Sequence, residues 1–143
     1  MPDRRVSTEL RREVAERARG CCEYCQSQAR FSMQSFSVEH IFPREKGGET
    51  ALENLALACQ GCNAHKHTKT EGRDPINKEN VTLFHPRHQH WRDHFAWDHT
   101  GTLILGLTPI GRATVEALKL NREALVNLRR ALRTTGDHPP PDV

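Results

Sequence analysis

Apolar residues near the N-terminus recur at the spacing of one helix face. They predict a first helix that runs to about Arg19 and is ended by Gly20. Its capping and apolar positions are Ser7 or Thr8, Leu10, Val14 and Ala18.

The middle of the chain carries short apolar runs instead. Residues 36–41 and 54–58 predict two short strands, the first ending at Pro43 because proline cannot continue a strand ladder. Residues 46–48 (Lys-Gly-Gly) predict the turn between them. A short polar helix is expected over residues 61–70.

The pattern becomes polar again after this helix. Residues 71–80 contain Pro75 and predict a connecting loop. Residues 91–97 and 102–107 flank His-Thr-Gly at 99–101, which predicts a β-hairpin.

Two helices are predicted near the C-terminus. Thr108 followed by Pro109 is a cap with proline at the first helical position, and this helix is expected to end at about Leu118. Asn121 is expected to cap the second, and residues 136–143 to form a disordered tail. The apolar face of the second helix is Leu125, Leu128 and Leu132.

Composition adds a constraint on stability. The chain has 143 residues, which predicts a single domain over residues 1–135. Only 36% of residues are apolar, so the core is lean and needs an additional staple. No apolar run is long enough for a membrane span and no signal peptide is evident, so we expect a cytoplasmic protein. Disulfides are rare there, and the five cysteines therefore indicate a metal site.

Four of the cysteines form two C-x-x-C pairs, Cys22 with Cys25 and Cys59 with Cys62. Four thiolates close a tetrahedral structural Zn²⁺ site, which contributes directly to folding. C-type haem is excluded because neither pair is followed by histidine, and a thioredoxin-like redox pair would need a strand and a helix around it, whereas Cys22 follows a helix. Reduced buried thiols remain the alternative. Cys21 is left over.

The 33 residues between the pairs, together with Asn63 just after the second pair, carry the groups that phosphodiester hydrolysis requires. Glu39 and His40 lie together at the end of the first predicted strand, Asn54 precedes the second, and Asn63 opens the polar helix. They supply a general base, an oxygen ligand, an orienting amide and a second ligand for a cation.

The runs EHIFPREKGG and NLALACQGCNAHK resemble the HNH endonuclease family, in the branch with two zinc knuckles. The resemblance covers residues 20–70, while residues 94–112 resemble the tail of small stand-alone bacterial HNH proteins. It implies an α+β fold in which a ββα-metal motif is inserted between the knuckles. An N-terminal helix and a C-terminal hairpin with helices would complete this fold.

The resemblance also implies roles for individual residues. His40 matches the general base, and Asn54 the residue that orients its ring. Glu39 and Asn63 match the ligands of a catalytic divalent cation, Mg²⁺, Mn²⁺ or Ni²⁺, although Glu39 is one methylene longer than the usual aspartate. Adjacent strand residues point to opposite faces, so both reach one site only if the strand bends or ends there. His67, one helical turn after Asn63, is a further ligand candidate, with an exposed helical histidine as the alternative.

The expected partner is DNA, and the sequence predicts no particular oligomeric state. The net charge is only +3, but residues 108–135 are basic, which suits a phosphate backbone, although most basic helix faces are simply solvated. Lys66 is a further candidate for a phosphate contact. The basic residues of the C-terminal segment are Arg112, Lys119, Arg122, Arg129, Arg130 and Arg133.

The residues, together with the resemblance, predict metal-dependent DNA hydrolysis. The alternative is a non-catalytic zinc module that binds nucleic acid, and an adaptor for protein interaction would leave the insert unexplained. His90 and His94 have the spacing of a helical zinc pair, but the surrounding residues 85–99 lack the glutamate of H-E-x-x-H.

Overall fold

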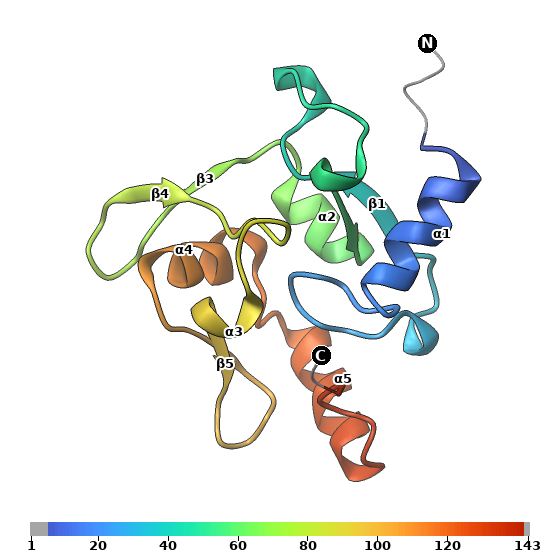
Figure 1. Ribbon diagram of the computed structural model, residues 1–143. Helices are drawn as coiled ribbons and strands as arrows, with labels where there is room; N and C mark the ends of the chain where they lie inside the picture. Colours follow the sequence, from blue (N-terminus) through green and yellow to red (C-terminus); the bar gives the residue numbers. More distant parts are fainter. Residues whose placement is uncertain (1–5, 142–143) are drawn as a thin grey trace.

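The computed structural model describes residues 6–141, which form three small antiparallel sheets with helices packed around them (Figure 1). Three short 3-10 turns lie at Ala29–Phe31, Arg44–Lys46 and Leu52–Asn54. The helices are α1 (Thr8–Arg17), α2 (Gln60–Lys66), α3 (Trp91–His94), α4 (Pro109–Leu118) and α5 (Glu123–Thr134). The strands are β1 (Ser37–His40), β2 (Leu55–Ala58), β3 (Glu71–Arg73), β4 (Asn80–Thr82), β5 (Phe95–Trp97) and β6 (Ile104–Gly106).

β1 and β2 lie between the two cysteine pairs, and α2 begins at the second pair. β1 pairs antiparallel with β2, with His40 opposite Leu55, and α2 follows β2 directly. α1 lies against β2, where Val14 is fully buried with Leu55 and Leu57 in a small separate core (Figure 1). The α+β prediction is confirmed, with the two strands between the knuckles and the helix of the ββα unit carrying the second knuckle itself.

Residues 71–80 differ from the predicted loop. β3 and β4 lie within and beside this segment and pair as a hairpin, with Gly72 opposite Val81. Gly72 lies close to Leu83 and Ala113, so a side chain there would collide with the Leu83 side chain. The polar composition concealed the strands because they are short and largely exposed, and because α4 supplies the surface on which they pack.

The predicted cap residue is confirmed for the first of the two C-terminal helices and wrong for the second. Thr108 caps α4, its Oγ1 accepting from the Gly111 amide at 3.0 Å, and Pro109 is the first helical residue. The N-cap position of α5 belongs to Arg122. Asn121 instead pairs with the β6 backbone, accepting from the Ile104 amide at 2.7 Å and donating to its carbonyl at 2.9 Å.

The predicted tail is ordered over its first residues. His138 is buried, with its Nε2 2.9 Å from the Gly101 carbonyl and its ring edge-on to Trp97 at 4.6 Å. The Asp137 carbonyl accepts from Gln28 at 2.7 Å. The prediction of a disordered segment from residue 136 is therefore wrong at these positions; residues 142–143 lie outside the described part.

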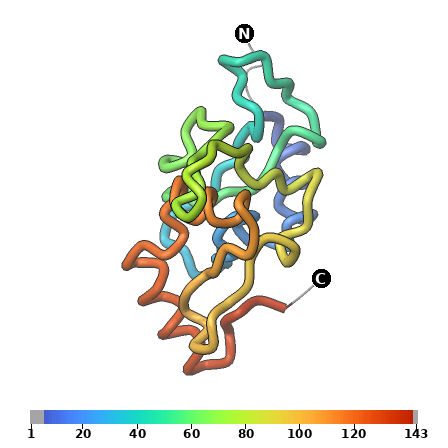
Figure 2. Tube along the Cα trace, turned by 90° about the vertical axis from the view of Figure 1, so that its left-hand side faces the viewer, coloured from blue at the N-terminus to red at the C-terminus, as the bar shows by residue number. Residues whose placement is uncertain are grey.

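Both views place the loop after β1 at one end of the molecule and α5 at the other (Figures 1 and 2). The larger hydrophobic core lies between them and includes the four cysteines, Phe84, Phe95 and Leu118. Within residues 6–141, no helix has the length and apolarity needed to cross a bilayer.

Candidate active site and metal centre

The two C-x-x-C pairs meet in one buried cluster. Cys22 and Cys25 lie in the turn after α1, Cys59 is the N-cap of α2, and Cys62 lies in its first turn. The four sulfurs all lie within 4.8 Å of one another, and Cys25 Sγ is 3.7 Å from Cys59 Sγ. With Zn–S bonds of about 2.3 Å, a tetrahedron places its sulfurs roughly 3.8 Å apart. The donor set and its spacing fit a structural zinc ion.

Backbone amides already support the negative charge of this cluster. The Cys25 amide donates to Cys22 Sγ at 3.5 Å, and the Cys62 amide donates to Cys59 Sγ at 3.4 Å. Hydrogen bonds from the other three thiols lower the pKa of Cys59, so that a thiolate forms readily. Cys21 lies outside the cluster, with its sulfur directed to the Arg19 carbonyl at 3.7 Å.

A polar groove opens at the end of β1 and has a volume of about 730 Å³. His40 lies on one wall, and Asn63 and His67 lie one turn apart on the α2 side. The His40 Nε2 is 2.8 Å from Thr50 Oγ1, which fixes the ring from the loop. Burial and the nearby Arg44 lower the pKa of His40, so its imidazole is neutral and can accept a proton at pH 7.

Glu39 contributes to the wall of the same groove, but its carboxylate is only 4% exposed. It accepts a short hydrogen bond from the Tyr24 hydroxyl and pairs with Lys66 Nζ at 3.2 Å. Lys66 also donates to the Ile41 carbonyl at 2.8 Å. Burial raises the pKa of Glu39, while Lys66 and Tyr24 oppose that rise. Adjacent strand positions have thus separated Glu39 from His40, as strand alternation requires.

The match to known proteins falls on this same region. Residues 22–69 match the family described as HNH endonuclease. This segment is similar to an HNH endonuclease domain. Comparisons with curated proteins and with solved structures give no significant match. An HNH domain implies nuclease-type chemistry, and its matched residues enclose both the cysteine cluster and the groove.

The donors present fit a catalytic cation of the HNH domain only in part. Asn63 and His67 line the groove and offer an amide oxygen and an imidazole. Glu39 does not fit, because its charge is balanced by a buried ammonium and both its oxygens are engaged. The implied ligand pair of Glu39 and Asn63 is therefore not assembled in this structure.

Asn54 of the HNH domain does not contact His40. Its Oδ1 accepts from the Phe42 amide at 2.9 Å, and its Nδ2 donates to the carbonyls of Phe42 and Glu49 at 3.1 and 2.8 Å. These bonds close the loop that carries Thr50, so Asn54 acts on His40 through the loop, which corrects the implied direct contact. The loop also requires Gly48, since a Cβ there would lie 1.8 Å from the Phe42 carbonyl oxygen.

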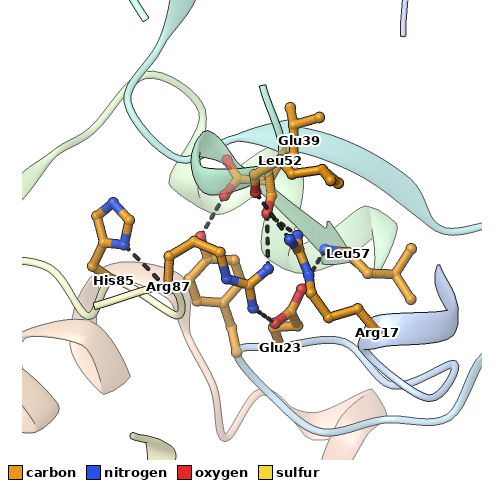
Figure 3. Close-up of polar contacts among 9 residues, drawn as sticks. Arg17, Glu23, Glu39, Leu52, Leu57, His85 and Arg87 are labelled. Carbon is orange, nitrogen blue, oxygen red and sulfur yellow. Dashed lines mark hydrogen bonds and ion pairs between the residues drawn. The ribbon is translucent and has the colours of Figure 1, made fainter. Parts of the chain in front are cut away.

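A polar network fixes the outer edge of β2 behind the groove (Figure 3). The Leu55 carbonyl accepts from Arg17 Nη2 at 2.7 Å and from Arg87 Nη1 at 3.1 Å. Glu23 pairs with Arg87 and accepts from the Leu57 amide at 3.0 Å. Since Leu55 is also the strand partner of His40, this network supports the groove from behind. No sequence motif indicated it, because its residues come from three distant segments.

The predicted phosphate contacts are mostly occupied elsewhere. Lys66 is buried on Glu39, and Arg129 is buried with its guanidinium on the carbonyls of Thr102 and Leu120 at 2.8 and 2.7 Å. Neither reaches solvent, which corrects both predictions.

The other two predicted phosphate contacts differ from each other. Arg112 is held by Asp74 through two bonds of 2.9 and 2.8 Å. Arg130 is exposed and bonds the Asn127 side chain at 3.0 Å. Nearer the groove, Arg44 is exposed on its wall.

The histidine-rich segment forms no second metal cluster among the described residues. His85 and His88 stack with ring centroids 3.8 Å apart. His94 Nδ1 is 2.7 Å from Thr108 Oγ1, at the start of α4, and the nearby Phe84 ring contacts it edge-on.

Proposed function

We propose that this protein is an endonuclease that hydrolyses DNA phosphodiester bonds, with His40 as the general base. The observation that carries the proposal is the placement of His40. Its ring is held by Thr50, its pKa is lowered, and it faces a polar groove inside the matched HNH segment.

The proposed reaction is a displacement at phosphorus. The neutral imidazole of His40 takes a proton from water while the water oxygen forms a bond to phosphorus. The bond from phosphorus to the leaving sugar oxygen breaks, and that oxygen takes up a proton from solvent. A divalent cation held by Asn63 and His67 would supply charge stabilisation to the phosphate, with imidazole favouring Mn²⁺ or Ni²⁺ over Mg²⁺.

Two features support a nucleic-acid substrate. The groove is open to solvent, and Arg44 provides a cation on its wall. Arg130 on α5 lies at the far end of the molecule, so we propose the rim beside Arg44 as the main phosphate contact.

Cleavage of supercoiled plasmid by wild-type protein and by His40→Ala, at equal zinc content, tests the proposal. The assay includes Mg²⁺, Mn²⁺, Ni²⁺ or Co²⁺. His65→Ala is the matched control, because His65 is an exposed histidine on α2 that does not line the groove. Loss of a general base should lower the rate by about 10²–10⁴-fold, while the control stays active.

The pH profile gives an independent check. Because the pKa of His40 is lowered, wild-type activity should persist below pH 6.5, the ordinary pKa of histidine, before it falls. Equal cleavage by wild type and His40→Ala would assign the activity to another site. Binding of DNA without cleavage under any cation would instead favour a non-catalytic nucleic-acid-binding module.

A further inference from the structure

Arg122 lies over the cysteine cluster although it belongs to the joint between α4 and α5. Its Nη2 is 3.3 Å from Cys59 Sγ and 3.7 Å from Cys62 Sγ, and its Nη1 is 3.6 Å from Cys62 Sγ. Both sulfurs belong to the second knuckle, about sixty residues earlier in the chain. One guanidinium therefore donates to two zinc-ligating sulfurs.

The surroundings of Arg122 are shaped to hold this position. Its Nη1 also donates to the carbonyls of Leu118 and Lys119, at 3.2 and 3.0 Å, where α4 ends. On the other side the guanidinium packs against Gly61, where an added Cβ would lie only 2.4 Å from Nη2. The side chain is thus fixed from both the α4 and the α2 sides.

The charge of the cluster explains why a cation is useful there. Four thiolates around Zn²⁺ leave a net charge of about −2, and burying uncompensated charge is unfavourable. The amides of Cys25 and Cys62 donate to sulfur but carry no net charge. A guanidinium offers both hydrogen bonds and a full positive charge, and groups that hydrogen-bond metal ligands stabilise the bound metal.

We propose that Arg122 is a positioning residue of the zinc site, which offsets the charge of the tetrathiolate, slows zinc loss and fastens the α4–α5 pair to the second knuckle. This role is independent of the proposed nuclease chemistry.

The experiment compares Arg122→Met with Arg130→Met, a matched variant at an exposed arginine of α5. Zinc transfer from folded, zinc-loaded protein to the chelator 4-(2-pyridylazo)resorcinol is followed by absorbance. Arg122→Met should release zinc about 10–100-fold faster than wild type, because loss of a hydrogen-bonding partner of a metal ligand has effects of that size. Arg130→Met should match wild type, and Arg122→Lys should lie between them.

A spectroscopic readout separates this role from general loosening of the fold. In protein loaded with Co²⁺, loss of hydrogen bonds to sulfur should move the sulfur-to-cobalt charge-transfer band to longer wavelength in Arg122→Met. The ligand-field bands should stay those of a tetrahedral S₄ site. An unshifted charge-transfer band together with wild-type zinc release would overturn the proposal.

Gly61→Ala keeps the arginine but displaces its guanidinium, and therefore serves if Arg122→Met does not fold. Faster zinc loss in Gly61→Ala supports the proposal, and wild-type release from this variant contradicts it. Wild-type protein that folds without zinc would contradict the zinc site itself, whatever the variants show.

Discussion

The buried pair of Lys66 and Glu39 leads to a quantitative prediction. Replacing Lys66 with Met keeps the length of the side chain but leaves Glu39 charged in a site where its carboxylate is 4% exposed. At the observed 3.2 Å, two unit charges attract by about 5 kcal/mol for an effective dielectric constant of about 20. Removing one partner of a buried pair typically costs about 3–5 kcal/mol. We expect Lys66→Met to lower the free energy of unfolding by about that amount.

Denaturant and thermal unfolding measure this loss. A change of 3–5 kcal/mol corresponds to a fall in Tm of about 10–17 °C for a chain of this size. Lys69→Met is the control, because the Lys69 side chain is exposed and donates to the His65 carbonyl at 3.1 Å. Exposed substitutions of this kind usually change stability by less than about 0.5 kcal/mol.

The pH dependence gives the prediction its sign. Lys66 lowers the pKa of Glu39, so its removal raises further a pKa that burial already raises. A carboxyl whose pKa is higher in the folded state than in the unfolded state destabilises the folded state at pH values where that carboxyl is ionised. The deficit of Lys66→Met should therefore be small below about pH 4.5 and grow as the pH rises to neutrality.

A double variant tests whether the loss comes from the unpaired charge of Glu39. Glu39→Gln combined with Lys66→Met removes both charges, and the double variant should be more stable at pH 7 than Lys66→Met alone. A deficit under about 1 kcal/mol that is equal at pH 4 and pH 7 would show that the pair is effectively solvated. That result would also restore Glu39 as a free carboxylate for a cation in the groove.

Three further predictions concern the metal centre, the loop and the Arg112 ion pair. Purified protein should hold about one zinc per chain by metal analysis; Cys59→Ser should lose it with a large fall in Tm, and Cys21→Ser should retain it. Asn54→Ala should speed amide exchange at Phe42, since it removes the bonds that close the loop; unchanged exchange would contradict this role. Arg112 lowers the pKa of Asp74 to about 2, so stability should fall as pH drops from about 4 to 2, and Arg112→Gln should flatten that dependence in a Tm series.

Local signals in the sequence predicted the elements that local chemistry controls. Thr108 and Pro109 set the start of α4, and the two C-x-x-C pairs were sufficient to predict one cluster. Residues 71–80 were misjudged because short exposed strands lack an apolar alternation, and their pairing depends on the surface of α4.

The sequence predicted which residue types form the candidate site, but not which way their side chains point or which partners they contact. His40 lies in the groove as the sequence suggested, yet its partner Thr50 belongs to a loop without any motif. The basic residues were least predictable. Lys66 and Arg129 look like surface cations in sequence, but their partners lie 9 to 27 residues away and only the folded chain brings them together.

The arginines on β2 have a consequence for how the protein behaves at high concentration. A two-stranded sheet leaves its outer backbone groups available to strands of neighbouring molecules, and such edges start aggregation. Here the Leu55 carbonyl accepts hydrogen bonds from Arg17 and Arg87. The Leu57 amide donates to the Glu23 carboxylate, and the Leu57 carbonyl accepts from the Glu23 amide. These side chains therefore cover an edge that would otherwise need a third strand. They hinder a strand of another molecule from pairing with this edge of the short sheet.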